Sequence, residues 1–268
     1  MQTPLIERSV LSIAGSDSCG GAGAQADLNT FASFGVYGAS VITAVTARNT
    51  LGVKAFEPVS DHLVVAQIEA VLEDLPVRAI KVGSIPSVAG IAILGELLES
   101  QAAPVPLVVD PVVIELEERK LASGDTALEA IQNHLFPLAT VITPNLEEAQ
   151  VLTGLKIEDM ESMEAAAREL LASGPGAVLL KGGKFEGSTV HDMLVDANGL
   201  QLFTHQAFPG RFHGTGCALS SAIAAGLALE KSLPEAVRDA IAYVQTCLEN
   251  SLAPVKGRLA LLGHSPRN

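Results

Sequence analysis

The chain alternates between short runs of apolar, often β-branched residues and longer stretches in which apolar residues recur every three or four positions. The short runs predict strands and the longer stretches predict helices, because the two structures repeat their faces at these different spacings. We expect strands at Val10–Ala14, Ala39–Val45, Ala79–Val82, Leu107–Asp110, Thr140–Thr143, Ala177–Leu180, Val190–Val195 and Gln201–Phe208. We expect helices at Ala24–Phe34, Asp61–Leu75, Ile91–Ser100, Thr126–Leu135, Leu146–Leu152, Met160–Ala172, Ala218–Leu229 and Leu233–Leu252.

This alternation predicts an α/β fold with a mainly parallel central sheet and helices on both of its faces. The last two strands differ, because Asn198-Gly199 between them is typical of an antiparallel hairpin turn. Neither a linker nor an internal repeat interrupts the pattern, so we expect residues 1–268 to form a single domain. Ligands of such folds bind beyond the carboxyl ends of the strands. Polar side chains predicted at those ends are Asp17, Lys81, Asp110, Asn145 and Lys181.

The composition is that of a folded protein with an acidic surface. Apolar residues make up 48% of the chain and charged residues 18%, which suffices for a buried core and excludes a disordered chain. The net charge is −13 and the sequence contains no run of lysine and arginine, so we expect neither nucleic acid nor a membrane surface as partner. A phosphate-binding site in this chain therefore has to be built locally.

The cysteines indicate a reducing compartment. Cys19, Cys217 and Cys247 are far apart, and their spacing matches neither a CxxC motif nor a zinc motif. The segment Met1–Ser9 lacks the apolar core of a signal peptide, and no apolar run approaches the length of a membrane span. We therefore expect a cytoplasmic protein.

The pentapeptide HGTGC, His213–Cys217, leads directly into the small-residue helix predicted from Ala218. A turn that opens a helix in this way aims several backbone N–H groups at one point, and the helix dipole adds positive charge there. Gly214 and Gly216 allow close approach of a ligand, and Thr215 adds a hydroxyl donor. The arrangement suits a phosphate or a phosphoryl group in transfer. The alternative is an ordinary turn before a helix, because short motifs often occur by chance.

A second glycine-rich segment, GSDSCGGAG at Gly15–Gly23, follows the first predicted strand. Its backbone can approach a small ligand closely, and Asp17 offers a carboxylate just past the strand. The alternative role of Asp17 is to cap the next helix. The spacing fits neither a dinucleotide-binding glycine motif nor a Walker A loop.

Polar residues that suit magnesium and nucleotide follow the middle strands. Asp110 comes after a buried strand, and Asn145 and Glu148 lie one helical turn apart at a helix start. Carboxylate oxygens together with water are the usual ligands of Mg²⁺, although a helix start of this kind can also be merely exposed. Lys181 precedes two glycines and can either neutralise nucleotide phosphates or be an ordinary exposed lysine.

Taken in order, several segments of this chain resemble one known family. They are GSDSCGGAG (15–23), VDPV (109–112), TPNLEEA (143–149), LLKGG (179–183) and FHGTGC (212–217). The pattern resembles the ribokinase-like superfamily and, within it, the bacterial hydroxymethylpyrimidine/phosphomethylpyrimidine kinases of thiamin biosynthesis. The resemblance runs from about Val10 to Leu252, which is nearly the whole chain.

The resemblance implies a three-layer ribokinase-like fold and an ATP- and Mg²⁺-dependent kinase. Its small-molecule substrate would be 4-amino-5-hydroxymethyl-2-methylpyrimidine and then the monophosphate of that compound. Relatives in the superfamily are often dimers, so a homodimer is expected. Because HGTGC is shared with vitamin B6 kinases, a pyridoxal or pyridoxine kinase, or a kinase of a related heteroaromatic alcohol, is the alternative activity. A non-catalytic ligand-binding protein on a kinase fold is a third possibility, against which the intact candidate site argues.

The resemblance also assigns roles to matching positions. Asp17, Gly21 and Gly23 would bind the pyrimidine, Asp110 and Glu148 would hold Mg²⁺ through water, Asn145, Lys181 and Gly183 would line the ATP site, and Gly214, Thr215 and Gly216 would form an anion hole. Cys217 stands where many sugar kinases of the superfamily have a catalytic aspartate. A thiol at a helix N-terminus has a lowered pKa and can accept the proton of an attacking hydroxyl, although a small buried cysteine is the alternative. His213 can contact a phosphate or be structural.

Three departures from the family pattern fall at the substrate end. Arg48 replaces a glutamine that reads the pyrimidine edge, and a guanidinium cannot accept a hydrogen bond but can pair with a carboxylate or phosphate. Ser84 replaces a methionine that packs on the ring, which makes the wall smaller and more polar. In the flap at 113–125, Ser123, Gly124 and Asp125 match the family but Ala122 replaces its lysine.

Overall fold

The computed structural model describes residues 5–101, 103–112, 124–185, 187–254 and 256–264. The flap departure at Ala122 and the matching Ser123 therefore lie outside the described residues. The chain forms two compact units, one made of residues 1–85 and 210–268 and the other of residues 86–209. None of the described helices is both long and apolar enough to cross a membrane.

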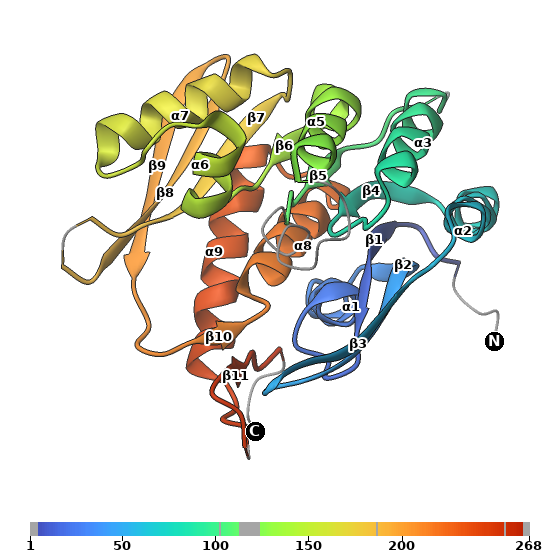
Figure 1. The fold of residues 1–268 in the computed structure, drawn as a ribbon, viewed down its shortest axis with the longest axis horizontal. Helices are drawn as coiled ribbons and strands as arrows, with labels where there is room; N and C mark the ends of the chain where they lie inside the picture. Colours follow the sequence, from blue (N-terminus) through green and yellow to red (C-terminus); the bar gives the residue numbers. More distant parts are fainter. Residues whose placement is uncertain (1–4, 102, 113–123, 186, 255, 265–268) are drawn as a thin grey trace. The chain divides into compact units, whose positions relative to one another are not determined.

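The first unit contains a sheet in the order β3-β2-β1-β4 (Figure 1). Its strands are β1 (Ser9–Asp17), β2 (Tyr37–Asn49), β3 (Gly52–Pro58) and β4 (Val77–Val82). β1 runs parallel to both β2 and β4, whereas β3 returns antiparallel to β2. Its helices are α1 (Gly23–Ser33), α2 (Asp61–Asp74), α8 (Thr215–Ala228) and α9 (Leu233–Glu249).

Helix α8 is the central helix of this unit. It packs against β1 and β4, against α1 on one side and against α9 on the other. Its small side chains allow this burial on several sides, since Ala218, Ala222, Ala224 and Ala225 are all 0% exposed. The fold therefore holds the start of α8, where the HGTGC turn lies, in fixed relation to the end of β1.

A short two-stranded sheet supports that turn. β10 (Phe212–His213) pairs in parallel with β11 (Ala260–Leu261), and the Ala260 amide donates a 2.9 Å hydrogen bond to the Arg211 carbonyl. The C-terminal segment is in this way attached to the residues that enter α8.

The second unit contains a sheet in the order β5-β6-β7-β8-β9, with helices packed against it. Its strands are β5 (Leu107–Val109), β6 (Val141–Ile142), β7 (Ala177–Gly183), β8 (Thr189–Asp196) and β9 (Gly199–Gln206). Its helices are α3 (Val88–Glu99), α5 (Gly124–His134), α6 (Leu146–Thr153), α7 (Met160–Ala172) and the short 3₁₀ helix η1 (Phe136–Leu138). β5, β6 and β7 are parallel, whereas β8 and β9 form the predicted antiparallel hairpin.

The predicted α/β class is confirmed, and so is most of the element order. Three strands were not predicted. β3 has almost no buried residue, and β10 and β11 have two residues each, so none of them shows an apolar alternation. The single domain expected for residues 1–268 stays a prediction.

Candidate active site

The glycine-rich segment after β1 folds around the carboxylate of Asp17. Asp17 is the last residue of β1 and is 4% exposed. Its Oδ1 accepts a 3.0 Å hydrogen bond from the Cys19 amide, and its Oδ2 accepts one of 3.0 Å from the Ala22 amide. Ala22 is the residue that caps α1, so Asp17 orders the turn into this helix. Asp17 is not the cap of α1, whose N-cap is Ala22 and has no side-chain cap hydrogen bond, but it holds the loop that leads into this helix.

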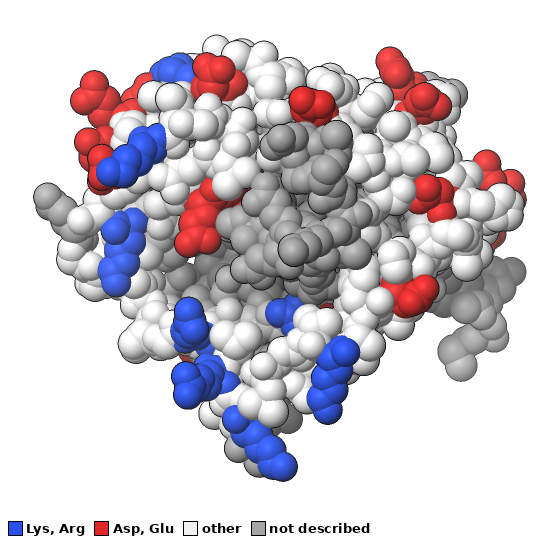
Figure 2. Space-filling view, in the orientation of Figure 1, with Lys and Arg blue, Asp and Glu red and all other residues white. Residues whose placement is uncertain are grey.

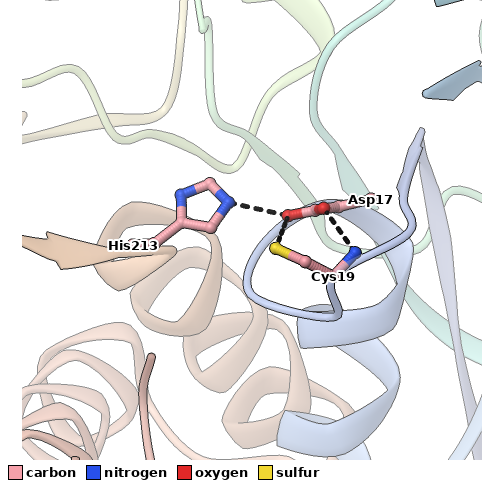
Figure 3. Close-up of side chains that lie close together, drawn as sticks. All are labelled: Asp17, Cys19 and His213. Atoms are coloured by element: carbon pink, nitrogen blue, oxygen red, sulfur yellow. Dashed lines mark hydrogen bonds and ion pairs between the residues drawn. The ribbon is translucent and has the colours of Figure 1, made fainter. Parts of the chain in front are cut away.

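His213 reaches the same carboxylate from the other end of the chain. Its Nε2 lies 2.7 Å from Asp17 Oδ2, as Figure 3 shows. Burial raises the pKa of Asp17, but hydrogen bonds from His213 and from Cys19 oppose it and hold that pKa at about 2. Asp17 is therefore a carboxylate at neutral pH and can accept a hydrogen bond from a ligand amine.

The Asp17 loop and the HGTGC turn touch through glycines. A Cβ on Gly214 would overlap the carbonyl oxygen of Gly21, and Gly214 has a φ of +86°, which disfavours any other residue. A Cβ on Gly21 would overlap the His213 ring and lie 2.8 Å from Leu261 Cδ2. The two segments predicted to bind substrate and phosphate are therefore in direct contact within the first unit. Gly23 is similarly confined, since a Cβ there would overlap the Gly15 carbonyl oxygen.

The HGTGC turn begins α8 and leaves its first backbone amides open, as an anion-binding helix start requires. Gly214 is the N-cap and has no side chain, and the Ala218 amide makes a hydrogen bond of 2.9 Å to the Gly214 carbonyl. The amides of Thr215 and Gly216 therefore have no acceptor within the helix and, with the helix dipole, favour an anion. The Cys217 thiol follows in this first turn and is half-buried.

Basic side chains gather on one part of the face drawn in Figure 2, although the chain carries a net charge of −13. They lie where Figure 1 draws β10, β11 and the lower end of β3. β10 leads directly into the turn that opens α8. Positive charge is therefore concentrated locally on this face of an acidic protein.

Both substitutions at the substrate end belong to the first unit. At the end of β2, the Arg48 amide donates to Ser18 Oγ at 2.7 Å, and this hydroxyl donates back to the Arg48 carbonyl at 2.8 Å. Burial and the Asp17 carboxylate raise the pKa of the Cys19 thiol, while the charge of Arg48 lowers it. Ser84 follows β4, and its carbonyl accepts a 2.7 Å hydrogen bond from Thr43 Oγ1. Arg48 is thus attached to the Asp17 loop through Ser18.

Lys81 does not line a ligand site but lies in the core. It is 0% exposed, and its Nζ lies 3.0 and 2.9 Å from the two carboxylate oxygens of Asp27. Ser12 Oγ and Ser221 Oγ donate to the same carboxylate at 2.6 and 2.7 Å. These side chains join β1, β4, α1 and α8 beneath the two glycine segments. Sequence reasoning missed this network because Asp27 and Ser221 lie within otherwise apolar helix faces.

In the second unit, Asp110 and Lys181 form an ion pair. Asp110 directly follows β5 and is 3% exposed, and its Oδ1 lies 2.9 Å from Lys181 Nζ. Lys181 also donates to the Thr143 carbonyl, and Thr143 Oγ1 donates to Asp110 Oδ1 at 3.3 Å. The lysine is therefore ordered and directed at the carboxylate rather than being an ordinary exposed side chain.

Asn145 and Glu148 cap α6 and bring a second carboxylate close to this pair. The Glu148 amide donates to Asn145 Oδ1, and the Asn145 amide donates to Glu148 Oε2, each at 2.8 Å. Burial raises the pKa of Glu148, Lys181 lowers it and Asp110 raises it again. The charge of Asp110 thus acts on Glu148, and so does the opposite charge of Lys181. Hard oxygen donors with this excess negative charge fit a Mg²⁺ ion.

The turn after Lys181 is held by Asp192, which sequence reasoning did not single out. The Gly182 amide, at a φ of +89°, donates a 2.7 Å hydrogen bond to Asp192 Oδ1. The other oxygen of Asp192 lies 3.0 Å from His205 Nε2. Gly183 has no room for a side chain, since a Cβ there would lie 2.8 Å from Met163 Sδ. The pairing between β7, β8 and β9 therefore lets Asp192 and His205 support the turn that carries Gly183, the glycine predicted to line the ATP site.

These observations agree with a comparison to known families. The profile described as phosphomethylpyrimidine kinase matches residues 17–261. The chain belongs to the phosphomethylpyrimidine kinase family. A hydroxymethylpyrimidine/phosphomethylpyrimidine kinase of Rhizobium meliloti is 46% identical over 240 residues, which are 89% of each chain.

Solved structures of family relatives agree in fold. The pyridoxal kinase from Staphylococcus aureus in complex with AMP-PCP has a TM-score of 0.87 and 34% identity, and the match covers 96% of this chain and 93% of that one. A phosphomethylpyrimidine kinase from Clostridium difficile has a TM-score of 0.76 and 42% identity, with 89% and 98% covered. The ribokinase-like fold expected from the sequence is confirmed by these matches.

Proposed function

We propose that this member of the family is an ATP-dependent kinase of 4-amino-5-hydroxymethyl-2-methylpyrimidine and of its monophosphate, in thiamin biosynthesis. One observation supports it most directly, namely the contact between the Gly21 and Gly214 backbones. It brings the carboxylate of Asp17 and the opened amides of α8 together in a chain of this family. A substrate with an amine at one side and a hydroxymethyl group at the other can use both.

In this proposal the Asp17 loop binds the heteroaromatic ring. The ionised carboxylate accepts a hydrogen bond from the ring amine, and the tightly packed Gly21 and Gly23 hold the loop around that carboxylate. Arg48 and Ser84 contribute the remaining contacts of the substrate end, where this chain differs from the family pattern.

Cys217 and the α8 amides serve the transfer itself. The hydroxymethyl oxygen forms a bond to the γ-phosphorus, the bond from that phosphorus to the β,γ-bridging oxygen breaks, and ADP leaves. The Cys217 thiolate accepts the hydroxyl proton, while Gly214, Thr215 and Gly216 stabilise the charge on the moving phosphoryl group.

The second unit supplies the nucleotide end. Asp110 and Glu148 would hold Mg²⁺, which when bound neutralises phosphate charge. Lys181, Asn145 and Gly183 would contact ATP, with the lysine kept in position by Asp110 and Thr143. We include in the proposal a homodimer, which the family resemblance implies, and a cytoplasmic location, which the sparse cysteines favour.

Vitamin B6 is the second candidate substrate, and a specific observation favours it. Arg48 and Ser84 replace the glutamine and methionine expected for a plain aminopyrimidine, and a guanidinium can pair with a phenolate or phosphate oxygen. The same Asp17 loop and α8 turn would then receive pyridoxal or pyridoxine.

A coupled assay of ADP release separates the candidates. Mg·ATP would be supplied with the hydroxymethylpyrimidine, with its monophosphate, or with pyridoxal and pyridoxine. The proposal predicts turnover of both pyrimidines. Turnover of the B6 vitamers alone would establish the second candidate, and ATP binding without turnover of either class would reject both.

A further inference from the structure

Three side chains of different chemistry converge at the Asp17 loop. Cys19 Sγ lies 3.6 Å from Asp17 Oδ2, His213 Nε2 lies 2.7 Å from the same oxygen, and all three donor atoms lie within 4.8 Å of one another (Figure 3). Among the residues that the structure describes, these three are the one set of histidine, cysteine or acidic side chains whose possible metal-ligand atoms lie this close together. Cys19 and His213 lie almost two hundred positions apart in the sequence, so motif spacing could not reveal the group.

Two of the three separations come close to those in the first coordination shell of a tetrahedral metal ion, and all three ligand atoms lie within 4.8 Å of one another. With Zn–S near 2.3 Å and Zn–N and Zn–O near 2.0 Å, tetrahedral ligand atoms lie roughly 3.3–3.6 Å apart. The sulfur and the carboxylate oxygen are already at this separation, and the nitrogen and oxygen need to part by less than about 1 Å. Asp17 is also held by two backbone amides, which orient it as outer hydrogen bonds orient metal ligands.

We propose that Asp17, Cys19 and His213 form a binding site for Zn²⁺ or a similar borderline transition metal, with water as the fourth ligand. Thiolate, imidazole and carboxylate are a donor set that favours zinc over magnesium. On binding, the Cys19 thiol loses its proton to solvent as the Zn–S bond forms. His213 binds the metal through Nε2 as a neutral imidazole whose single ring proton is on Nδ1, and the metal then lies between Nε2 and Asp17 Oδ2 in place of the hydrogen bond.

The site has a consequence for catalysis, and this consequence rests on the proposed function. Asp17 cannot bind a metal ion and accept a hydrogen bond from a ring amine with the same oxygen. Zinc therefore inhibits by competing with the pyrimidine, while Mg·ATP binds in the second unit and is not displaced. Cys19 makes the chain sensitive to free zinc at its substrate loop.

Cobalt spectroscopy tests the site without any activity measurement. Titration of the metal-free protein with Co²⁺ is expected to give visible ligand-field bands and a near-ultraviolet band from thiolate-to-cobalt charge transfer. Cys19→Ser is expected to remove the charge-transfer band and weaken competing zinc binding by at least about tenfold, and His213→Gln to weaken it similarly. Cys217→Ser is the matched control, because it removes another half-buried cysteine of the same unit. A band that persists in Cys19→Ser, or that disappears in Cys217→Ser, would overturn the proposal.

Two measurements use the unmodified protein, so they test the site even if a variant fails to fold. Zn²⁺ is expected to slow alkylation of Cys19, mapped by mass spectrometry, and to leave the alkylation of Cys217 unchanged. In the kinase assay, micromolar zinc in excess Mg²⁺ should raise the apparent KM for the pyrimidine and leave that for ATP unchanged. Equal alkylation of Cys19 with and without zinc would refute the site. An enzyme that does not use pyrimidines would contradict the proposed function alone, since the cobalt and alkylation results do not depend on it.

Discussion

At the scale of single residues, the first turn of α8 explains why a cysteine can serve in phosphoryl transfer. The helix start offers amides and a dipole that favour negative charge, so it favours the thiolate of Cys217 as well as the transferred phosphoryl group. Positioning and electrostatics supply most of the catalysis in such reactions, so a modest base suffices.

Replacing Cys217 by alanine should lower kcat far more than it weakens ATP binding. The loss of a general base costs about 10²–10⁴-fold in rate, whereas the predicted ATP contacts lie in the second unit. Steady-state kinetics with the pyrimidine would give kcat and the KM for ATP separately. Equal turnover by the variant would remove Cys217 from the mechanism.

His205 is expected to make stability depend on pH. Its hydrogen bond to Asp192 raises the pKa of His205, against the lowering caused by burial. The stabilisation is therefore fully present below the unfolded pKa near 6.5 and is lost as pH rises through the higher folded pKa. Urea unfolding of His205→Gln should show a loss of about 1 kcal/mol at pH 5 that disappears by about pH 9.

The exposed His62 provides the control for this measurement. His62→Gln should unfold like the unmodified protein at both pH values. A deficit of His205→Gln that is as large at alkaline as at acidic pH would show that the charged pair with Asp192 is not its cause.

Sequence alone singled out Asp17, Asp110, Glu148 and Lys181 as candidates, because each follows a strongly apolar strand or begins a helix. It did not locate their supports. Asp192 and His205 lie in an ordinary alternating hairpin, and the partner of His213 is the distant Asp17. Their pairing depends on the order of strands in the sheets, which periodicity does not contain.

At the scale of elements, one buried network joins the two segments that the proposed function uses. Asp27 on α1 accepts hydrogen bonds from Lys81 on β4, from Ser12 on β1 and from Ser221 on α8. α1 follows the Asp17 loop and α8 follows the HGTGC turn, so the network fixes the starts of both helices. The sequence placed Lys81 at a strand end but not in the core, because its partners are invisible to a pattern of apolar positions.

Lys81→Met should destabilise the protein by about 3–5 kcal/mol, because it leaves the buried Asp27 charge without a cation. Urea unfolding measures this cost. The double variant Asp27→Asn/Lys81→Met should be less destabilised than the sum of the two single variants. The exposed pair of Arg168 and Glu164 is the control, and Arg168→Met should cost less than about 1 kcal/mol. Additive costs in the double variant would contradict a coupled pair.

Gly214→Ala should cost much more stability than Gly154→Ala. Both glycines have positive φ, +86° and +71°, which costs a residue with a Cβ about 1–2 kcal/mol. A Cβ at Gly154 meets nothing within 4 Å, whereas one at Gly214 overlaps the Gly21 carbonyl. Thermal unfolding of both variants isolates this overlap. Similar losses would mean that the two glycine segments do not pack as described.

At the scale of the whole molecule, an acidic protein is proposed to bind phosphorylated ligands, which its net negative charge repels. Local structure explains how it can bind them. The net charge of −13 does not attract phosphorylated ligands, but the start of α8 offers a local partial positive charge, and basic side chains gather on one part of the surface. The fold class and family follow from the sequence because the alternation and the motifs extend over nearly the whole chain. The substrate does not, because Arg48 and Ser84 alter the residues that would specify it.

The most direct test is a phosphorus NMR time course with the hydroxymethylpyrimidine and Mg·ATP. The account predicts that a phosphomonoester signal grows first and that a diphosphate ester distinct from ADP follows, with one ATP consumed at each step. Release of inorganic phosphate without an ester signal, or an ester formed with pyridoxal but not with the pyrimidine, would contradict the assignment of this chain to the pyrimidine.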